Sequence, residues 1–90
     1  MVKRKPQPRG LGTKATGARV LTLRLLANLS QTQVARACEM SEGAYRFIEQ
    51  GKSEPRAATL RALCKTLGAS ADFILFGAPV RAAAATTDAA

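Results

Sequence analysis

Between residues 30 and 56 the chain gathers side chains that can hydrogen-bond to bases and to anions. Arg46 can donate two parallel hydrogen bonds to a guanine edge or to a phosphate group. Lys52 and Arg56 follow soon after, and their charges could neutralise phosphates. These residue types and spacings therefore support binding to a polyanion rather than the making or breaking of covalent bonds.

Residue types that catalyse reactions or hold metal ions are scarce. The sequence has no histidine, no glycine-rich phosphate loop, and no pair of carboxylates that converge on one predicted face. Cys38 and Cys64 lie far apart without histidine companions, so zinc-finger spacing is absent. Both fall on apolar faces of predicted helices, where a free cysteine fills a core position. We expect no enzymatic activity, no metal and no cofactor.

The positive charge of the chain is concentrated at its beginning. Fourteen basic and six acidic side chains in 90 residues give a formal net charge of +8, and a small protein this basic usually binds a polyanion. Residues 1–14 hold five of the basic side chains and none of the acidic ones, together with two prolines and two glycines. We expect residues 1–16 to form a flexible basic arm. The arm could lie along a groove of DNA or serve only to keep the protein soluble.

Membrane insertion and secretion are not expected. No apolar run approaches the length of about 18 residues that a membrane span needs. The basic start is not followed by the apolar core of a signal sequence, because Gly10, Gly12, Thr13 and Gly17 interrupt it. A cytoplasmic protein, bacterial or phage-encoded, fits these features.

The apolar residues between positions 17 and 77 recur at helical spacing, and no alternating run of β-branched residues competes. A first helix is predicted over residues 17–27. Its apolar stripe consists of Val20, Leu23, Leu26 and Ala27. Asn28 can end this helix because asparagine tolerates the left-handed conformation.

Serines predict where the next two helices begin. Ser30 and Gln33 have the spacing of a capping box, which starts a second helix. After a very short gap, Ser41 is suited to cap a third helix that ends at Gly51. With Tyr45 facing the core, helical geometry divides this third helix into two faces. The inward face also holds Ser41, Ala44 and Ile48, and the outward face holds Gly43, Arg46, Phe47 and Gln50.

Two more helices complete the folded part. Pro55 opens a fourth helix that Gly68 ends. Its apolar face consists of Leu60, Leu63, Cys64 and Leu67. Ser70 can cap a short fifth helix, which Gly77 closes. We therefore predict one all-α domain over residues 17–77, followed by a disordered tail over residues 78–90.

The residues of this domain resemble the Cro-and-repressor type of helix-turn-helix protein, the XRE family. The matching positions are, in chain order, Gly17, Val20, Leu23, Arg24, Leu29-Ser30-Gln31, Val34-Ala35, Met40-Ser41, Ile48-Glu49-x-Gly51, Pro55, Leu60, Leu63 and Leu67-Gly68. The resemblance implies a compact five-helix, lambda-repressor-like domain. It also implies that the helix over residues 41–50 enters the major groove of double-stranded DNA.

The resemblance also indicates which residues meet DNA. The expected DNA-binding set is Gln31, Thr32, Ser41, Glu42, Gly43, Arg46, Phe47, Gln50, Lys52, Ser53 and Arg56. In relatives the counterpart of Gln31 contacts the phosphate backbone, and the loop at Lys52, Ser53 and Arg56 contacts flanking phosphates. The alternatives are a solvated first turn and a solvated loop. Phe47 could touch a thymine methyl group, pack on a partner or fold back onto a neighbouring helix.

Three acidic or small residues depart from the family pattern. Glu42 and Gly43 stand where relatives often have Gln and Ser, and Glu39 stands where the family usually has Gly in the turn. A left-handed turn would be strained at Glu39. Glu42 could accept a hydrogen bond from cytosine N4, or it could only complement the dipole of its helix.

Two further groups are expected to be structural. Arg24 and Glu49 match a pair that joins the first and third helices in relatives, and we expect a partly buried ion pair. The fifth helix carries Ile74, Leu75 and Phe76, which is more apolar surface than one small face needs. Family members often dimerise through this end, so a homodimer is expected, although core burial could account for part of that surface.

The leading functional hypothesis is a sequence-specific DNA-binding transcription regulator, a repressor that occupies an operator as a homodimer. One alternative is the antitoxin of a toxin–antitoxin pair that also regulates its own operon, with a toxin as partner. Another is a protein-interaction module that kept the fold without the DNA contacts. Glu39, Glu42 and the modest charge of residues 15–77 favour that last alternative.

Overall fold

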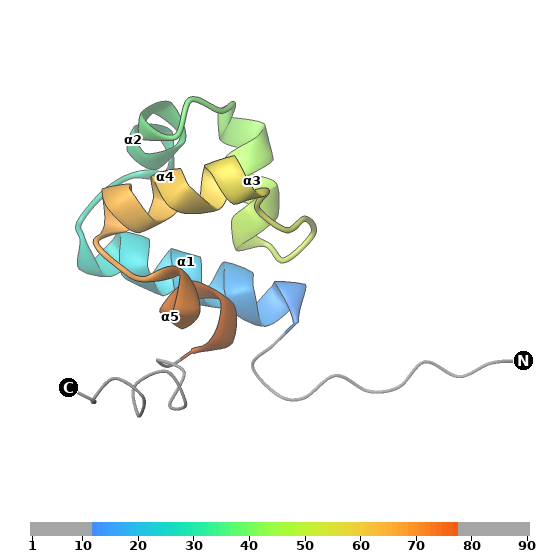
Figure 1. Cartoon of the computed structure of the whole chain (residues 1–90). Helices are drawn as coiled ribbons and strands as arrows, with labels where there is room; N and C mark the ends of the chain where they lie inside the picture. The colour runs from blue at the N-terminus through green and yellow to red at the C-terminus, as the bar shows by residue number, and fades with distance from the viewer. Residues whose placement is uncertain (1–11, 78–90) are drawn as a thin grey trace, which may run out of the picture.

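The computed structural model describes residues 12–77, which form five helices and no strand (Figure 1). The helices are α1 (Thr13–Leu26), α2 (Gln31–Ala37), α3 (Glu42–Glu49), α4 (Ala57–Leu67) and α5 (Ala71–Phe76). The predicted all-α, five-helix fold class is confirmed. Most of the expected basic arm, residues 1–11, and the expected tail, residues 78–90, lie outside the described residues.

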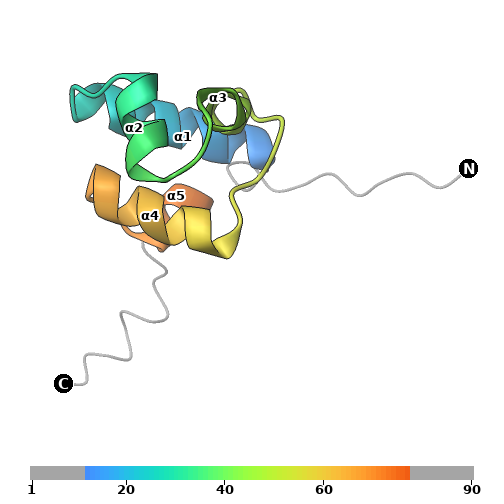
Figure 2. The same ribbon diagram turned by 90° about the horizontal axis from the view of Figure 1, so that it is seen from above.

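The helices pack around one core. α1 packs against α3 and also against α5, and α2 packs against α3. α4 contacts α1, α2 and α5 (Figure 1). In the view from above, α1, α2 and α3 lie on one side of the molecule, and α4 and α5 lie on the other (Figure 2). Each helix therefore buries one face against at least two others.

All five helices contribute to the core. Its buried residues are Val20, Val34, Ala35, Tyr45, Ile48, Leu63, Leu67 and Ile74. Cys38 and Cys64 are partly buried against this core as free thiols, as the sequence predicts. Burial raises the pKa of the Cys38 thiol. That thiol therefore stays protonated near neutral pH and behaves as a small apolar group.

The predicted apolar stripe of α1 is wrong in its last turn. Leu26 is 78% exposed, and Ala27 is exposed beyond the end of the helix. At 100° per residue, Leu26 points about 120° away from the buried Val20. Arg24 lies much closer to the direction of Val20, so a charged residue occupies the inward position of this turn.

α1 begins at Thr13, four residues before the predicted start, so residues 13–16 belong to the folded domain and not to the arm. Contacts with distant residues hold this first turn. Thr13 donates a hydrogen bond to the Glu54 carboxylate at 2.8 Å, and Thr16 is buried. No local cap signals this start, because Gly12 precedes the helix without a side chain that could accept a hydrogen bond.

The predicted helix boundaries elsewhere agree with the structure to within two residues. The hydroxyls of Ser30, Ser41 and Ser70 each accept a hydrogen bond from the backbone N–H three residues later, and Gln33 completes the capping box of α2. The residues that end the helices in the left-handed conformation are Asn28, Glu39, Gly51, Gly68 and Gly77. Local side-chain chemistry therefore sets most of the helix ends.

Gly17 marks the place where the backbones of α1 and α3 come closest. A Cβ added at Gly17 would lie 2.2 Å from the carbonyl oxygen of Ile48 and 2.8 Å from that of Glu49. Both oxygens belong to backbone that cannot rotate away as a side chain could. Only glycine therefore allows α1 to cross the end of α3 at this distance.

We predict that Gly17→Ala lowers the free energy of unfolding by about 1–3 kcal/mol or more, because α1 must move away from α3. Urea denaturation followed by circular dichroism measures this. Gly43→Ala on α3 is the matched control, since a methyl group there meets nothing among the described residues. It should leave stability unchanged or raise it by up to about 1 kcal/mol. A Gly17→Ala variant as stable as the wild type would show that the close crossing is not required.

Candidate nucleic-acid interface

α2 and α3 form a helix-turn-helix unit with a short turn at residues 38–41. The backbone N–H of Glu39 donates to the carbonyl of Arg36, and the N–H of Met40 donates to that of Ala35, both at 3.0 Å. This is the Schellman arrangement, which places Glu39 in the left-handed conformation with φ of 56°. The turn is therefore made with glutamate at a position that favours glycine, and some backbone strain is stored there.

α3 has one buried and one exposed face. Tyr45 is fully buried and Ile48 is 3% exposed. The predicted outward residues Gly43, Arg46, Phe47 and Gln50 are all exposed. The exposed residues form a continuous surface on the side of α3 away from the core.

Ser41 and Ala44 were expected on the inward side of α3, but both are exposed. Ser41 precedes the helix as its cap. Ala44 lines an open cleft of about 530 Å³ between α3 and the beginning of α4, together with Met40, Phe47 and Pro55. Ala44 therefore borders this open cleft and is not packed in the core.

Two exposed contacts involve the outward residues. Arg46 forms an ion pair with Glu42 one helical turn earlier, with Nη2 and Oε2 3.2 Å apart. The ammonium of Lys52 lies 5.5 Å from the centre of the Phe47 ring, so Phe47 contacts the loop that follows α3. Phe47 nevertheless remains 52% exposed. Both contacts are at the surface and each contributes at most about 1 kcal/mol.

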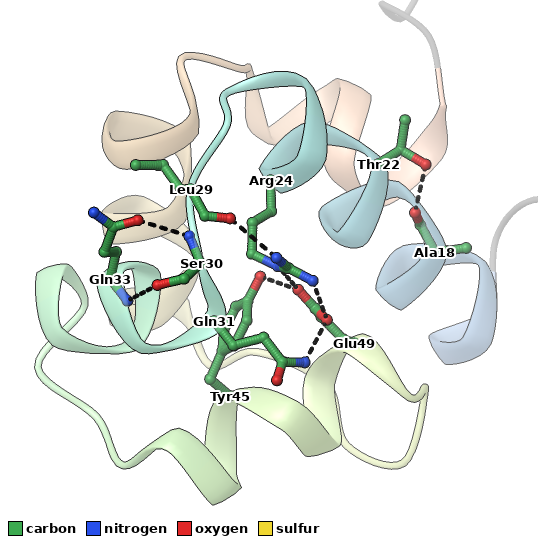
Figure 3. Close-up of polar contacts among 9 residues, drawn as sticks. All are labelled: Ala18, Thr22, Arg24, Leu29, Ser30, Gln31, Gln33, Tyr45 and Glu49. Atoms are coloured by element: carbon green, nitrogen blue, oxygen red, sulfur yellow. Dashed lines mark hydrogen bonds and ion pairs between the residues drawn. The ribbon is translucent and has the colours of Figure 1, made fainter.

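The carboxylate of Glu49 lies where α1, α2 and α3 meet (Figure 3). Its Oε2 accepts hydrogen bonds from Nε of Arg24 and from the Tyr45 hydroxyl, each at 2.5 Å. Its Oε1 accepts from Nε2 of Gln31 at 2.9 Å and from Nη2 of Arg24 at 3.3 Å. Arg24 also donates to the Leu29 carbonyl at 3.0 Å. We call Arg24, Gln31, Tyr45 and Glu49 the Glu49 network.

The ion pair expected between Arg24 and Glu49 is present, with side chains 12% and 5% exposed. Burial alone would raise the pKa of the Glu49 carboxyl, but the hydrogen bonds from Arg24, Tyr45 and Gln31 outweigh it and lower that pKa. Burial and then the neighbouring carboxylate raise the pKa of the Tyr45 phenol. The hydrogen bond to Glu49 raises the pKa of Arg24. At neutral pH the network thus contains one positive and one negative charge.

The other residues of the expected DNA-binding set lie beside α3. Thr32 is exposed in the first turn of α2, and Gln31 is half-buried with one N–H directed to Glu49. Lys52, Ser53 and Arg56 are exposed in the loop between α3 and α4. The expected DNA-binding residues outside α3 therefore come from the first turn of α2 and from the loop that follows α3.

The expected dimerisation set needs a correction. Ile74 is fully buried in the core and cannot form part of a surface. Leu75 is half-buried, and Phe76 is 49% exposed. Arg19 of α1 explains how α5 is held, because its guanidinium donates to the carbonyls of Ile74 and Leu75, both at 2.9 Å. Sequence reasoning missed this anchor, since an arginine inside a predicted helix carries no local sign of a contact 55 residues away.

Within residues 12–77 no group of three or more His, Cys, Asp or Glu side chains is placed to hold a metal ion. Over the same range, each helix is too short or too polar to cross a membrane.

Comparison with known proteins places this geometry among regulators. A sequence model of the helix-turn-helix family matches residues 20–74. Two crystal structures of the clp gene regulator ClgR from Corynebacterium glutamicum are each 27% identical to this chain. The match to one of them covers 83% of this chain and 91% of the ClgR chain, with a TM-score of 0.65. The match to the other covers 93% of this chain and 85% of the ClgR chain, with a TM-score of 0.70.

A crystal structure of the hypothetical transcription factor NHTF from Neisseria has the same fold. It is 14% identical, covers 97% of this chain and 98% of its own, and gives a TM-score of 0.68. Among curated proteins, no sequence match to this chain was found.

We predict that acid weakens the fold through Glu49. Because the pKa of Glu49 is lowered in the folded state, its stabilisation is present above the unfolded pKa of about 4.3 and is lost as pH falls through the folded pKa. The free energy of unfolding of the wild type, measured from pH 7 to pH 3, should fall more steeply than that of Glu49→Gln. Parallel pH curves for the two proteins would contradict this role of Glu49.

Proposed function

We propose that this chain, which belongs to the XRE-type helix-turn-helix family, represses transcription by occupying an operator as a homodimer. The family match and the likeness to clp gene regulators identify it more coarsely as a DNA-binding transcription regulator. Repression of this kind requires no catalysed reaction, because a protein bound at the operator excludes the transcription machinery from that DNA. Such a regulator would act where bacterial DNA lies, in the cytoplasm.

The observation that carries the proposal is the exposed face of α3 on a buried support. Arg46, Phe47 and Gln50 point outward, while Tyr45 and Ile48 hold the opposite face in the core. The eight residues of α3 span about 12 Å, which suits a major groove about 12 Å wide. An arginine on such a face can donate to both acceptors of a guanine.

Polar groups around α3 suit the phosphates on either side of the groove. The Gln31 amide uses one N–H for Glu49 and has a second N–H to donate to a phosphate oxygen. Lys52 and Arg56 are exposed and positively charged in the loop after α3. Phosphate contacts of this kind set the position of the helix, and base contacts supply the specificity.

A second copy of the chain would allow a two-fold operator to be read. Phe76 is 49% exposed at the end of α5, and Leu75 beside it is half-buried. Together they give the end of α5 an apolar surface on which a second copy would pack. In a symmetric dimer the two α3 helices would contact half-sites about 34 Å apart.

We expect Arg46→Ala to bind DNA much more weakly while keeping its fold. The probe is the duplex that the wild type enriches from a randomised pool, and fluorescence anisotropy gives the affinity. The loss of binding free energy should be about 1–3 kcal/mol, as for a bidentate guanine contact. Arg61→Ala, which removes an exposed arginine on α4, is the control and should change affinity little. The thermal unfolding of both variants should match that of the wild type, since the Glu42–Arg46 pair is exposed.

A salt titration separates DNA binding from a protein-interaction role. The logarithm of the wild-type affinity should fall linearly with the logarithm of salt concentration between about 50 and 200 mM, because phosphate contacts release counterions. No enriched duplex, or an affinity that salt does not change, would favour the interaction module instead.

We predict that Phe76→Glu weakens self-association because it places a charge on the proposed dimer surface. Sedimentation velocity over a range of protein concentrations measures this. Phe47→Glu is the matched control, since Phe47 is similarly exposed but lies on α3. If the dimer survives Phe76→Glu but dissociates with Phe47→Glu, the dimer interface lies on α3 and not on α5.

A further inference from the structure

Glu42 and Arg46 lie one helical turn apart on the outward face of α3. Their ion pair is formed at the surface, with side chains 43% and 46% exposed. Between them in sequence is Gly43, where even a Cβ would point into open space among the described residues. The pair therefore lies on the face of α3 that meets DNA in the proposed function. Gly43 has no side chain that would keep DNA away from it.

Phosphate binding does not account for a carboxylate at this place, and the contribution of Glu42 to folding is small. An exposed pair of this kind adds little to stability. Glu42 also repels phosphates, so it lowers the affinity for DNA of any sequence. Its first-turn position complements the helix dipole, but that effect acts on stability and leaves base preference unchanged. An effect of Glu42 on DNA recognition must therefore come through the bases or through the orientation of Arg46.

The pair has the hydrogen-bonding pattern that complements a G·C base pair. In the major groove, guanine presents the acceptors N7 and O6, and the cytosine paired with it presents the N4 amino donor beside O6. O6 and N4 are hydrogen-bonded to each other, so they lie about 2.9 Å apart. In the protein, donor Nη2 of Arg46 and acceptor Oε2 of Glu42 lie side by side at 3.2 Å. Arginine has five N–H groups, so those left after the ion pair can reach both guanine acceptors.

We propose that Glu42 and Arg46 act as one unit that specifies a single G·C base pair in each half-site, an inference that rests on the proposed function. Arg46 donates to guanine, while Glu42 accepts from the N4 amino group of the paired cytosine and holds the guanidinium in place. An A·T pair in the same orientation puts the adenine amino donor against Arg46 and the thymine O4 acceptor against Glu42. Both contacts then become repulsive, so the unit selects by rejection as well as by attraction.

The test compares the base preferences of the wild type, Arg46→Ala and Glu42→Gln in selections from the same randomised duplex pool. The wild type should specify G·C at one position of each half-site, and both variants should lose preference at that same position. Glutamine keeps the shape of Glu42 but can donate as well as accept, so it no longer requires cytosine N4. In titrations, replacing this G·C by A·T should weaken the wild type at least about fivefold more than Glu42→Gln.

Glu39→Gln is the matched control, because it removes another exposed negative charge, from the turn just before α3. It should raise affinity for all duplexes alike and leave every base preference unchanged. A Glu42→Gln variant with the wild-type preference overturns the inference, and duplex binding by the wild type then leaves the proposed function standing. The inference is also overturned if Glu42→Gln and Arg46→Ala lose base preference at different positions of the half-site. If Arg46→Ala binds as well as the wild type, Arg46 makes no base contact and the inference is overturned, while the proposed function stands. If the wild type binds no duplex, the proposed function itself fails.

Discussion

The carboxylate of Glu49 fixes how the first three helices approach one another. It is nearly buried and accepts hydrogen bonds from Arg24 on α1, Gln31 on α2 and Tyr45 on α3. A buried charge is tolerated only when its oxygens are paired, so the helices must adopt the arrangement that brings all three donors to it. Because a buried ion pair often stabilises no more than apolar packing would, we expect its main contribution to be the choice of one geometry.

A steric constraint acts on the same crossing of helices. Gly17 lets the backbone of α1 approach the carbonyls of Ile48 and Glu49, and Arg24 reaches Glu49 from two turns further along α1. A closer or more tilted crossing would clash at Gly17, and a wider one would leave Glu49 without its donors. Both constraints apply to the C-terminal half of α3, so the outward residues of this helix take part in neither.

Features that depend on neighbouring residues could be predicted from the sequence, and those that depend on distant contacts could not. The serine caps follow from a hydroxyl and the N–H three residues later, so Ser30 and Ser41 mark their helices correctly. The start of α1 depends on Glu54, and the burial of Ile74 depends on how α5 lies against α1. Family resemblance indicated the pair of Arg24 and Glu49, whereas the tyrosine hydroxyl that joins them follows only from three-dimensional geometry.

The two kinds of contact on α3 differ in strength, and this difference bears on recognition. The helix axis is held by buried groups, while Arg46 and Phe47 make only exposed contacts, with Glu42 and with Lys52. Phe47, and Arg46 together with Glu42, can therefore adjust to a base without disturbing the position of α3. The same separation explains how Glu42 and Gly43 can depart from the family pattern while the fold is kept, since neither touches the Glu49 network. Substitution on this face would change what the helix binds, and substitution in the network would change where the helix lies.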